Sequence, residues 1–511
     1  MSILSLGFAF TVGAKAQDAP SIAWQSCFGG SYTEVPKSIQ PTADGGYVVA
    51  GSSTSTGGQV GLNYGGKDCW VVKMDAAGVL EWSKVLGGSS NDEAFSAEQT
   101  SDGGYIMCGL TGSSDHDVTE NHGLFDAWMV KLDASGEMEW QRTLGGGNIE
   151  GESRIRQTSD GGYIMISGSF SSDGDLTQNH GAKDLWVVKM DGSGTIEWQR
   201  SYGGGDHDGG SWILELTEGG YLAIGTTYSN NGDVSGNHGV CDVWILKLGE
   251  DGTIEWQKAY GGNGYEGGIS IATTNDGGYI FTGGALSSTG DVSGHHGEGD
   301  FWVVKITAGG VLEWQRCLGG SGPDYGEAVF QTPDGGYLAA GKTFSTDGDV
   351  TYLHNGSDIW VVKLNPTGEL QWQKPMGSNS DDWGYGALQA SDGGYVITGN
   401  AGGNGGDVSG GHGNDEFWVV KLNAEDVGLS EAPLHALQII PNPTTGIVRL
   451  ANDVRGVHSI LVSDVIGNLV LTLQFTSTID LGSLADGVYT FELLDGAGVS
   501  LGNGRILKQE L

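Results

Sequence analysis

The chain of 511 residues carries a net charge of −39, from 63 acidic and 24 basic side chains. Nucleic-acid binding needs cationic side chains that neutralise phosphates, so this charge argues against that class of function. With 38% hydrophobic residues and 16 tryptophans, the chain is too apolar to be disordered despite its 93 glycines. The composition predicts many short strands and tight turns, and the acidity suits solubility or divalent cations.

The first 16 residues have the pattern of a secretory signal peptide. An apolar run from Ile3 to Val12 precedes the Ala14-Lys15-Ala16 cleavage pattern. The run is too short to span a bilayer, and no later apolar segment reaches a bilayer-spanning length either. We therefore expect export with removal of residues 1–16, and a mature chain without a transmembrane segment.

The cysteines do not indicate a disulfide framework. Their number is odd, no CxxC pair occurs, and they fall in expected strands, where cysteine acts as a small apolar residue. They are Cys27, Cys69, Cys108, Cys241 and Cys317. We expect them to be free thiols with a packing role.

From its N-terminal part onward the chain repeats every 58 residues without an insertion. The tyrosine of the DGGY tetrapeptide, once EGGY, falls at Tyr47, Tyr105, Tyr163, Tyr221, Tyr279, Tyr337 and Tyr395. One tryptophan series with this spacing is Trp70, Trp128, Trp186, Trp244, Trp302, Trp360 and Trp418. The other is Trp24, Trp82, Trp140, Trp198, Trp256, Trp314 and Trp372. Seven equal units indicate a repeat architecture.

Each unit contains four predicted strands, which we call a to d. In the second unit they are residues 94–100, 104–110, 127–133 and 137–144. They are rich in β-branched and aromatic residues, and clusters of Gly, Asp and Ser separate them. The SDGG and DASGE segments supply the residues that tight hairpin turns require.

Four antiparallel strands in seven units predict an all-β fold, a seven-bladed β-propeller over residues 17–423. The chain ends support a closed ring. Residues 21–28 have the pattern of a d strand with no a, b or c strand before them, and the last unit stops at a c strand, residues 417–423. We expect the N-terminal strand to complete the seventh blade, which removes exposed sheet edges.

The repeat resembles a family of secreted bacterial β-propeller repeats. The shared features are GGS followed by an acid after strand d, DGGY at strand b and D-x-W-V-V-K-L-D at strand c, over residues 21–423. The resemblance implies the fold and leaves the function open, because propellers host binding and catalysis alike.

The loop between strands b and c looks like a metal loop. In the third unit it reads SSDGDLTQNHGAKD, and Asp173, Asp175 and Asp184 are the candidate oxygen ligands for calcium. The D-x-D element occurs only in units two, three and six, and the compact D-x-D-x-D-G calcium pattern is missing. We therefore favour a structural role in loop hydrogen bonding, with calcium as the alternative cofactor.

A second acidic series follows the glycine turn between strands d and a. It consists of Glu34, Asp92, Glu150, Asp208, Glu266, Asp324 and Asp382. We expect these carboxylates to accept hydrogen bonds from N–H groups of that turn. The alternative is a ring of acids that holds a cation at the channel mouth.

The candidate ligand-binding residues are aromatic side chains that break the repeat. They are Tyr32, Trp212, Tyr265, Tyr325, Trp383 and Tyr385. Four of them, Tyr265, Tyr325, Trp383 and Tyr32, enter units five, six, seven and one, which adjoin in a closed ring. These residues predict a surface for carbohydrate stacking or protein docking; the alternative is scattered surface aromatics.

The sequence offers no enzyme signature in its proper setting. No H-E-x-x-H motif occurs, and the matches to G-x-S-x-G at 498–502 and to the P-loop pattern at 336–343 lack the following helix that either motif needs. Acids are too frequent for one carboxylate pair to indicate a glycosidase. We expect a binding protein without catalytic activity. A secreted polysaccharide hydrolase or lyase and a structural surface-layer component are the alternatives.

After a predicted linker at 424–436, residues 437–511 predict a small β-sandwich. This tail resembles the type A C-terminal sorting domain of the type IX secretion system of the Bacteroidetes. The residues that carry the resemblance include Pro441, Asn442, Pro443, Gly446, the DVIGN segment at 464–468, Gly487 within LADGVYTFEL, and Lys508. One departure is Ile440, where an aromatic residue often stands.

The resemblance implies that the secretion machinery recognises the tail and moves the chain across the outer membrane. Members of the family are then released or attached to the cell surface. An accessory adhesion domain is the alternative for this tail.

Overall fold

The computed structural model describes residues 18–412, 414–425, 439–440, 444–450, 458–464, 469–474, 478–494 and 500–509. The chain forms two compact units, Met1–Glu425 and Asp426–Leu511. The predicted signal peptide and nearly all of the predicted linker lie outside the described residues.

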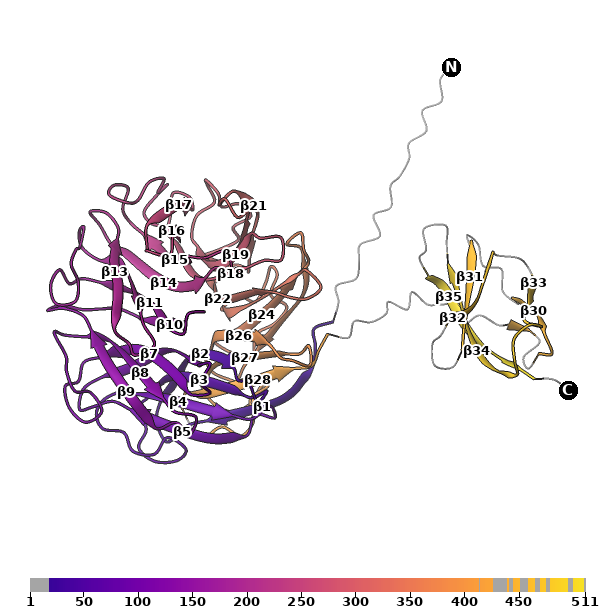
Figure 1. The fold of residues 1–511 in the computed structure, drawn as a ribbon, viewed down its shortest axis with the longest axis horizontal. Coiled ribbons are helices and arrows are strands. Elements are labelled where there is room, and N and C mark those ends of the chain that lie inside the picture. Colours follow the sequence, from indigo (N-terminus) through magenta and orange to yellow (C-terminus); the bar gives the residue numbers. More distant parts are fainter. Residues whose placement is uncertain are drawn as a thin grey trace, which may run out of the picture. The chain divides into compact units, whose positions relative to one another are not determined.

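Seven four-stranded antiparallel sheets form the described part of the first unit (Figure 1). Blades 1 to 3 are β2(Glu34–Pro41), β3(Tyr47–Ser53), β4(Asp68–Met74), β5(Leu80–Leu86); β6(Asp92–Gln99), β7(Tyr105–Thr111), β8(Asp126–Leu132), β9(Met138–Leu144); and β10(Arg154–Gln157), β11(Tyr163–Ser169), β12(Asp184–Met190), β13(Ile196–Tyr202). Blades 4 and 5 are β14(Asp208–Glu215), β15(Tyr221–Thr227), β16(Asp242–Leu248), β17(Ile254–Tyr260); and β18(Glu266–Thr273), β19(Tyr279–Ala285), β20(Asp300–Ile306), β21(Leu312–Leu318). Blades 6 and 7 are β22(Asp324–Gln331), β23(Tyr337–Thr343), β24(Asp358–Leu364), β25(Leu370–Met376); and β26(Asp382–Gln389), β27(Tyr395–Ala401), β28(Glu416–Leu422), β1(Ile22–Phe28).

The ring is closed by the N-terminal strand, as predicted. β1 pairs antiparallel with β28, and Phe28 lies opposite Phe417. The Trp418 indole N–H donates to Gln25 Oε1 at 3.0 Å, so the two chain ends of the propeller share one blade. The first strand of every blade contacts the first strand of the next blade around the whole ring, β26 to β2 included. These inner strands line a central channel, and the fourth strands are outermost.

The hairpins form because the turn sequence supplies the conformation that they need. In blade 2, Gly103 has a φ of 87°, a region that L-residues other than glycine rarely adopt. The Asp102 carboxylate accepts a hydrogen bond from the Gly104 N–H at 2.9 Å. The SDGG segment therefore makes the tight turn between β6 and β7.

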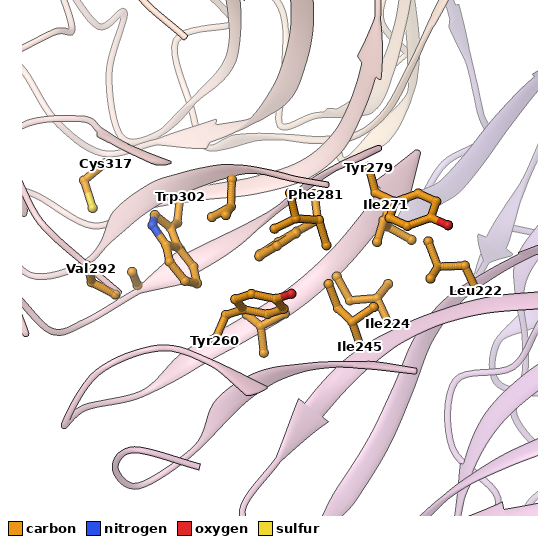
Figure 2. Packing of buried hydrophobic residues seen from close by; sticks show 14 of the residues in the cluster. Leu222, Ile224, Ile245, Tyr260, Ile271, Tyr279, Phe281, Val292, Trp302 and Cys317 are labelled. Atoms are coloured by element: carbon orange, nitrogen blue, oxygen red, sulfur yellow. The ribbon is translucent and has the colours of Figure 1, made fainter. Parts of the chain in front are cut away.

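The two tryptophan series have different structural roles. Those of the third strands are completely buried. Trp302, for example, packs edge-on against Phe281 at 5.7 Å between ring centroids and donates its N–H to Gln315 Oε1 at 2.8 Å. Figure 2 shows this cluster, in which Tyr260 and Ile245 of blade 4 meet the side chains of blade 5. The hydrophobic cores thus lie between neighbouring blades.

The tryptophans of the fourth strands explain why tryptophan and tyrosine repeat together. In every blade this tryptophan contacts the DGGY tyrosine of the next blade along the chain, or, for Trp24 of β1, of blade 1. The centroid distance between Trp82 and Tyr105, for example, is 5.2 Å. Each pair fastens the outer strand of one blade to its neighbour.

The described part of the second unit has two sheets. The first, in the order β29-β30-β33, consists of β29(Ile439–Ile440), β30(Ile447–Leu450) and β33(Thr478–Asp480). The second, in the order β32-β31-β34-β35, consists of β31(Ser459–Ser463), β32(Leu469–Gln474), β34(Gly487–Leu494) and β35(Ser500–Lys508). Val448 and Ile479 of the first sheet share a buried cluster with Ile460 and Phe491 of the second. This common core makes the unit the small β-sandwich that the sequence predicts.

Candidate functional site

The loop that resembles a metal site forms a clamp between a histidine and an aspartate. In blade 3, the backbone N–H of His180 lies 2.7 Å from Asp184 Oδ2, and its ring Nδ1 lies 2.7 Å from the same oxygen. The same contact between a histidine ring and an acid four residues later recurs in blades 2, 4, 5, 6 and 7. In blade 1 the backbone N–H of Tyr64 donates to Asp68 instead.

The other two candidate calcium ligands bind backbone groups. Asp175 Oδ2 accepts a hydrogen bond from the Gly145 N–H at 3.0 Å, and Asp173 Oδ1 accepts one from the Gly147 N–H at 2.8 Å. Both glycines belong to the turn between blades 2 and 3. Within the described residues, no group of three or more His, Cys, Asp or Glu side chains is arranged to hold a metal ion. The geometry supports the structural interpretation of this loop.

Chelation tests this interpretation directly. We expect thermal unfolding of the protein to give the same melting temperature with calcium and with EGTA at equal ionic strength, since Asp173, Asp175 and Asp184 already accept hydrogen bonds from the chain. Differential scanning calorimetry measures this. A clear fall in melting temperature with EGTA would instead show that the loops hold ions.

The acids after the glycine turn accept hydrogen bonds from it in every blade, as predicted. Each also faces the first acid of the third strand in the preceding blade. A methyl group on Gly87, for example, would lie 2.6 Å from Asp68 Oδ1 and 2.8 Å from Asp92 Oδ2, so only glycine fits beside these two carboxylates. We call these seven pairs the carboxylate pairs. They are Asp68/Asp92, Asp126/Glu150, Asp184/Asp208, Asp242/Glu266, Asp300/Asp324, Asp358/Asp382 and Glu416/Glu34.

The carboxylate pairs are buried, and burial raises the pKa of at least one member of each pair. Burial, together with the neighbouring charges of Asp92 and Asp117, raises the pKa of Asp68 to about 6. Asp382 also has a pKa raised to about 6, by burial and by the charge of Asp358. The Oδ1 atoms of Asp68 and four equivalent aspartates are buried without a hydrogen-bond partner in the described residues. The pairs are therefore structural elements of the propeller, and ionising them in the folded state costs free energy.

Two of the predicted aromatic residues, Tyr325 and Trp383, come together on adjacent blades. Tyr325 follows the first residue of β22, and Trp383 follows the first residue of β26. Lys342 of β23 lies over both rings, with its Nζ 5.4 Å from the Tyr325 centroid and 4.2 Å from the Trp383 centroid. We call Tyr325, Lys342 and Trp383 the rim cluster.

The rim cluster is held in place and is open to solvent. The Trp383 indole N–H donates to Ser357 Oγ at 3.0 Å, while 37% of the residue remains exposed. The Tyr325 ring packs over Gly284 of blade 5, where a methyl group would lie 3.1 Å from the ring. Fixed, partly exposed rings of this kind are suited to stacking on a ligand.

The other predicted aromatic residues lie elsewhere. Tyr265 and Tyr32 are exposed at the ends of blades 4 and 7, and no ring contact within the described residues joins them to the rim cluster. Trp212 and Tyr385 line a cavity of about 530 Å³ in the central channel, together with Lys37, Arg156 and Glu327 and other inner-strand residues. The predicted set is therefore divided between the rim and the channel.

In the channel, lysine and arginine side chains lie over aromatic rings. Arg154 and Arg156 lie with their guanidinium carbons 5.1 and 4.7 Å from the Trp212 ring. Lys37 Nζ lies 4.6 Å from the Tyr385 ring. These basic residues and Lys342 were not among the predicted site residues, although each breaks the 58-residue repeat just as the aromatics do.

The described residues of the sorting motif lie at strand ends of the second unit. The Gly446 N–H donates to Thr444 Oγ1 at 3.1 Å, and the Gly446 carbonyl accepts from the Leu481 N–H at 2.8 Å. Lys508 is buried and donates to the Leu484 carbonyl at 2.5 Å, and Gly487 pairs with it between β34 and β35. Pro441, Asn442 and Pro443 lie outside the described residues.

A comparison with protein families decides what the second unit is. Residues 438–502 match the family described as the secretion system C-terminal sorting domain. The second unit is a sorting domain of type IX secretion. The sorting domain indicates export to the cell surface or secretion. No helix long and apolar enough to cross a membrane occurs among the residues that the structure describes.

A curated protein is distantly similar to a large part of the chain. Regulatory protein FlaEY of Caulobacter vibrioides is 24% identical over 419 residues, which cover 71% of this chain and 42% of that protein. The chain thus spans less than half the length of this curated relative.

The similarity of the chain to solved structures is low as well. PorZ, a surface component of the type IX secretion system of Porphyromonas gingivalis, has a TM-score of 0.41 at 11% identity over 96% of this chain and 61% of its own. A puromycin hydrolase has a TM-score of 0.45 at 12% identity, over 93% of this chain and 62% of its own. At these scores the likenesses carry no argument about function.

Proposed function

We propose that this exported propeller is a non-catalytic binding module that recognises a glycan at the rim cluster, on the surface of a bacterium of the Bacteroidetes. The observation that carries the proposal is the meeting of Tyr325 and Trp383 around Lys342. The residues that repeat in every blade fasten the blades together, so a single ligand site must use residues in which the blades differ.

The chemistry of the rim cluster favours a sugar ligand. Aromatic rings offer apolar faces to the C–H side of a pyranose, and polar groups beside them bind its hydroxyls. Trp383 supplies the face, and its N–H is already engaged by Ser357, which fixes the ring before a ligand arrives. A preorganised ring costs little conformational entropy on binding.

The test is affinity electrophoresis of the full-length protein through gels that contain a panel of polysaccharides. We expect retardation by at least one polysaccharide, and Trp383→Ala should weaken that binding about tenfold, or about 1.4 kcal/mol. Tyr352→Ala is the matched control, because Tyr352 is an exposed aromatic residue of a b–c loop in blade 6. Equal retardation of Trp383→Ala and the wild-type protein, both with unchanged melting temperature, would contradict the proposal.

A further inference from the structure

We infer that the glycan is anionic, an acidic polysaccharide whose carboxylate or sulfate groups are bound by Lys342 and Lys37. This inference rests on the proposed function and adds the charge of the ligand. It follows from where the propeller places the basic residues that do not repeat.

Most basic residues of the propeller belong to the frame. Thirteen of the nineteen in residues 17–423 occupy two repeated positions, one in the third strand and one in the fourth. The other six are Lys37, Lys67, Arg154, Arg156, Lys183 and Lys342, of which only Lys67 and Lys183 stand at equivalent positions. Three of them, Lys37, Arg154 and Lys342, exert their charge on the same channel residue, Glu327. In a chain of net charge −39, this is a local concentration of positive charge.

The equivalent positions in other blades show that the frame does not need these lysines. Lys342 is replaced there by Ser52, Leu110, Gly168, Thr226, Gly284 and Asn400. Lys37 is replaced by Phe95, Ser153, Ser211, Ile269, Glu327 and Tyr385. None of these residues is basic, so the fold forms a blade without a cation at either place.

Lys342 and Lys37 are also free to take a ligand. Within the described part of the chain neither side chain has a hydrogen bond or an ion pair, and both ammonium groups lie over aromatic rings. Burial lowers the pKa of Lys342, although the charge of Glu327 opposes this. A partly desolvated ammonium without a direct partner gains more from an anion than a solvated one does.

The arrangement continues from the rim into the channel. Lys342 lies between the rim rings, and Lys37 lines the cavity of about 530 Å³ with Glu327 and Tyr385. Glu327 is the internal counter-ion of the neighbouring basic residues Lys342, Lys37 and Arg154. Burial raises the pKa of Glu327. Glu152 adds a second negative charge near Arg154 and Lys183. An acidic sugar on Trp383 would place its anionic group beside Lys342 and compete with Glu327 for it.

Two matched pairs of polysaccharides test the inference with the full-length protein: polygalacturonate with its methyl ester, and dextran sulfate with dextran. We expect at least one acidic member to bind about tenfold or more tightly than its neutral counterpart. Lys342→Gln should lower that binding about tenfold, and Glu327→Gln should strengthen it. Lys84→Gln is the matched control, because it removes the same charge from the outer strand β5, where Lys84 pairs with Glu137 at 2.7 Å.

The outcomes separate this inference from the proposed function. Equal binding of acidic and neutral members, lost in Trp383→Ala, would overturn the inference and leave the glycan function standing. Binding of poly-L-glutamate as tight as that of the acidic polysaccharides would show that the site recognises charge alone, and would overturn the inference. Binding to no polysaccharide of the panel would contradict both.

Discussion

A variant that lacks residues 18–28 is expected to lose at least about 5 kcal/mol of unfolding free energy, because it removes the strand that closes the ring. β1 places Phe28 and Cys27 in buried clusters of the blade interfaces. Phe28→Ala alone should cost about 3–5 kcal/mol. Deletion in addition exposes the edge of β28, a template for aggregation.

Urea unfolding followed by tryptophan fluorescence measures both losses. Ala23→Ser is the control within the same strand, because Ala23 is exposed, and it should unfold at the wild-type midpoint. An unchanged midpoint of the deletion variant would show that the ring is stable without β1 and that closure is not a source of stability.

The stability of the propeller is expected to be greatest near pH 4 and to fall as the pH rises toward 7. The cause is the carboxylate pairs, because at least one acid of each pair has a pKa that burial raises in the folded state. An acid with a raised folded pKa binds its proton more tightly in the folded state, so its contribution is complete below the unfolded pKa and is lost as the pH rises through the folded one. For Asp68 the window runs from 3.8 to about 6, a loss of about 3 kcal/mol.

The acids of the hairpin turns set the lower end of the pH range in which the propeller is stable. Burial alone would raise the pKa of Asp160, but hydrogen bonds from Lys189, Thr158 and Gly162 outweigh it and lower the pKa to about 2. Lys189 is buried and lies 2.8 Å from Asp160. Such an acid stabilises the fold above its unfolded pKa, and this contribution disappears as the pH falls from about 4 to about 2.

Urea midpoints between pH 3 and pH 8 measure this profile. Asp68→Asn should be more stable than the wild type at pH 7 and similar to it at pH 4, because the amide cannot ionise and can donate to Asp92. Glu298→Gln removes the same charge from an exposed position and should not change the shape of the profile. A stability that rises steadily from pH 4 to pH 8 would contradict the role assigned to the pairs.

The strands of the propeller could be predicted from the sequence almost to the residue. Strands expected at 94–100 and 127–133 run over Asp92–Gln99 and Asp126–Leu132. The reason is local, since Gly and Asp turns with special backbone angles end every strand. The closing strand could be predicted because a lone d pattern at one end matches a missing d strand at the other.

The carboxylate pairs and the basic residues could not be predicted in the same way. Both acidic series were visible in the sequence, but which members face each other depends on how one blade packs on the next. Lys342 and Tyr325 are partners across β22 and β23, while Trp383 joins them from another blade. Lys342 and Lys37 are nevertheless distinct in the sequence, because no other unit has a basic residue at either position.

The most direct test of the binding site is a crystal structure of the protein with an oligosaccharide cut from the polysaccharide that it binds. Our account predicts one sugar stacked on Trp383, with its anionic group beside Lys342, and no sugar at the equivalent positions of the other blades. Sugars bound at the repeated b–c loops of several blades would contradict it, because the ligand site would then belong to the frame.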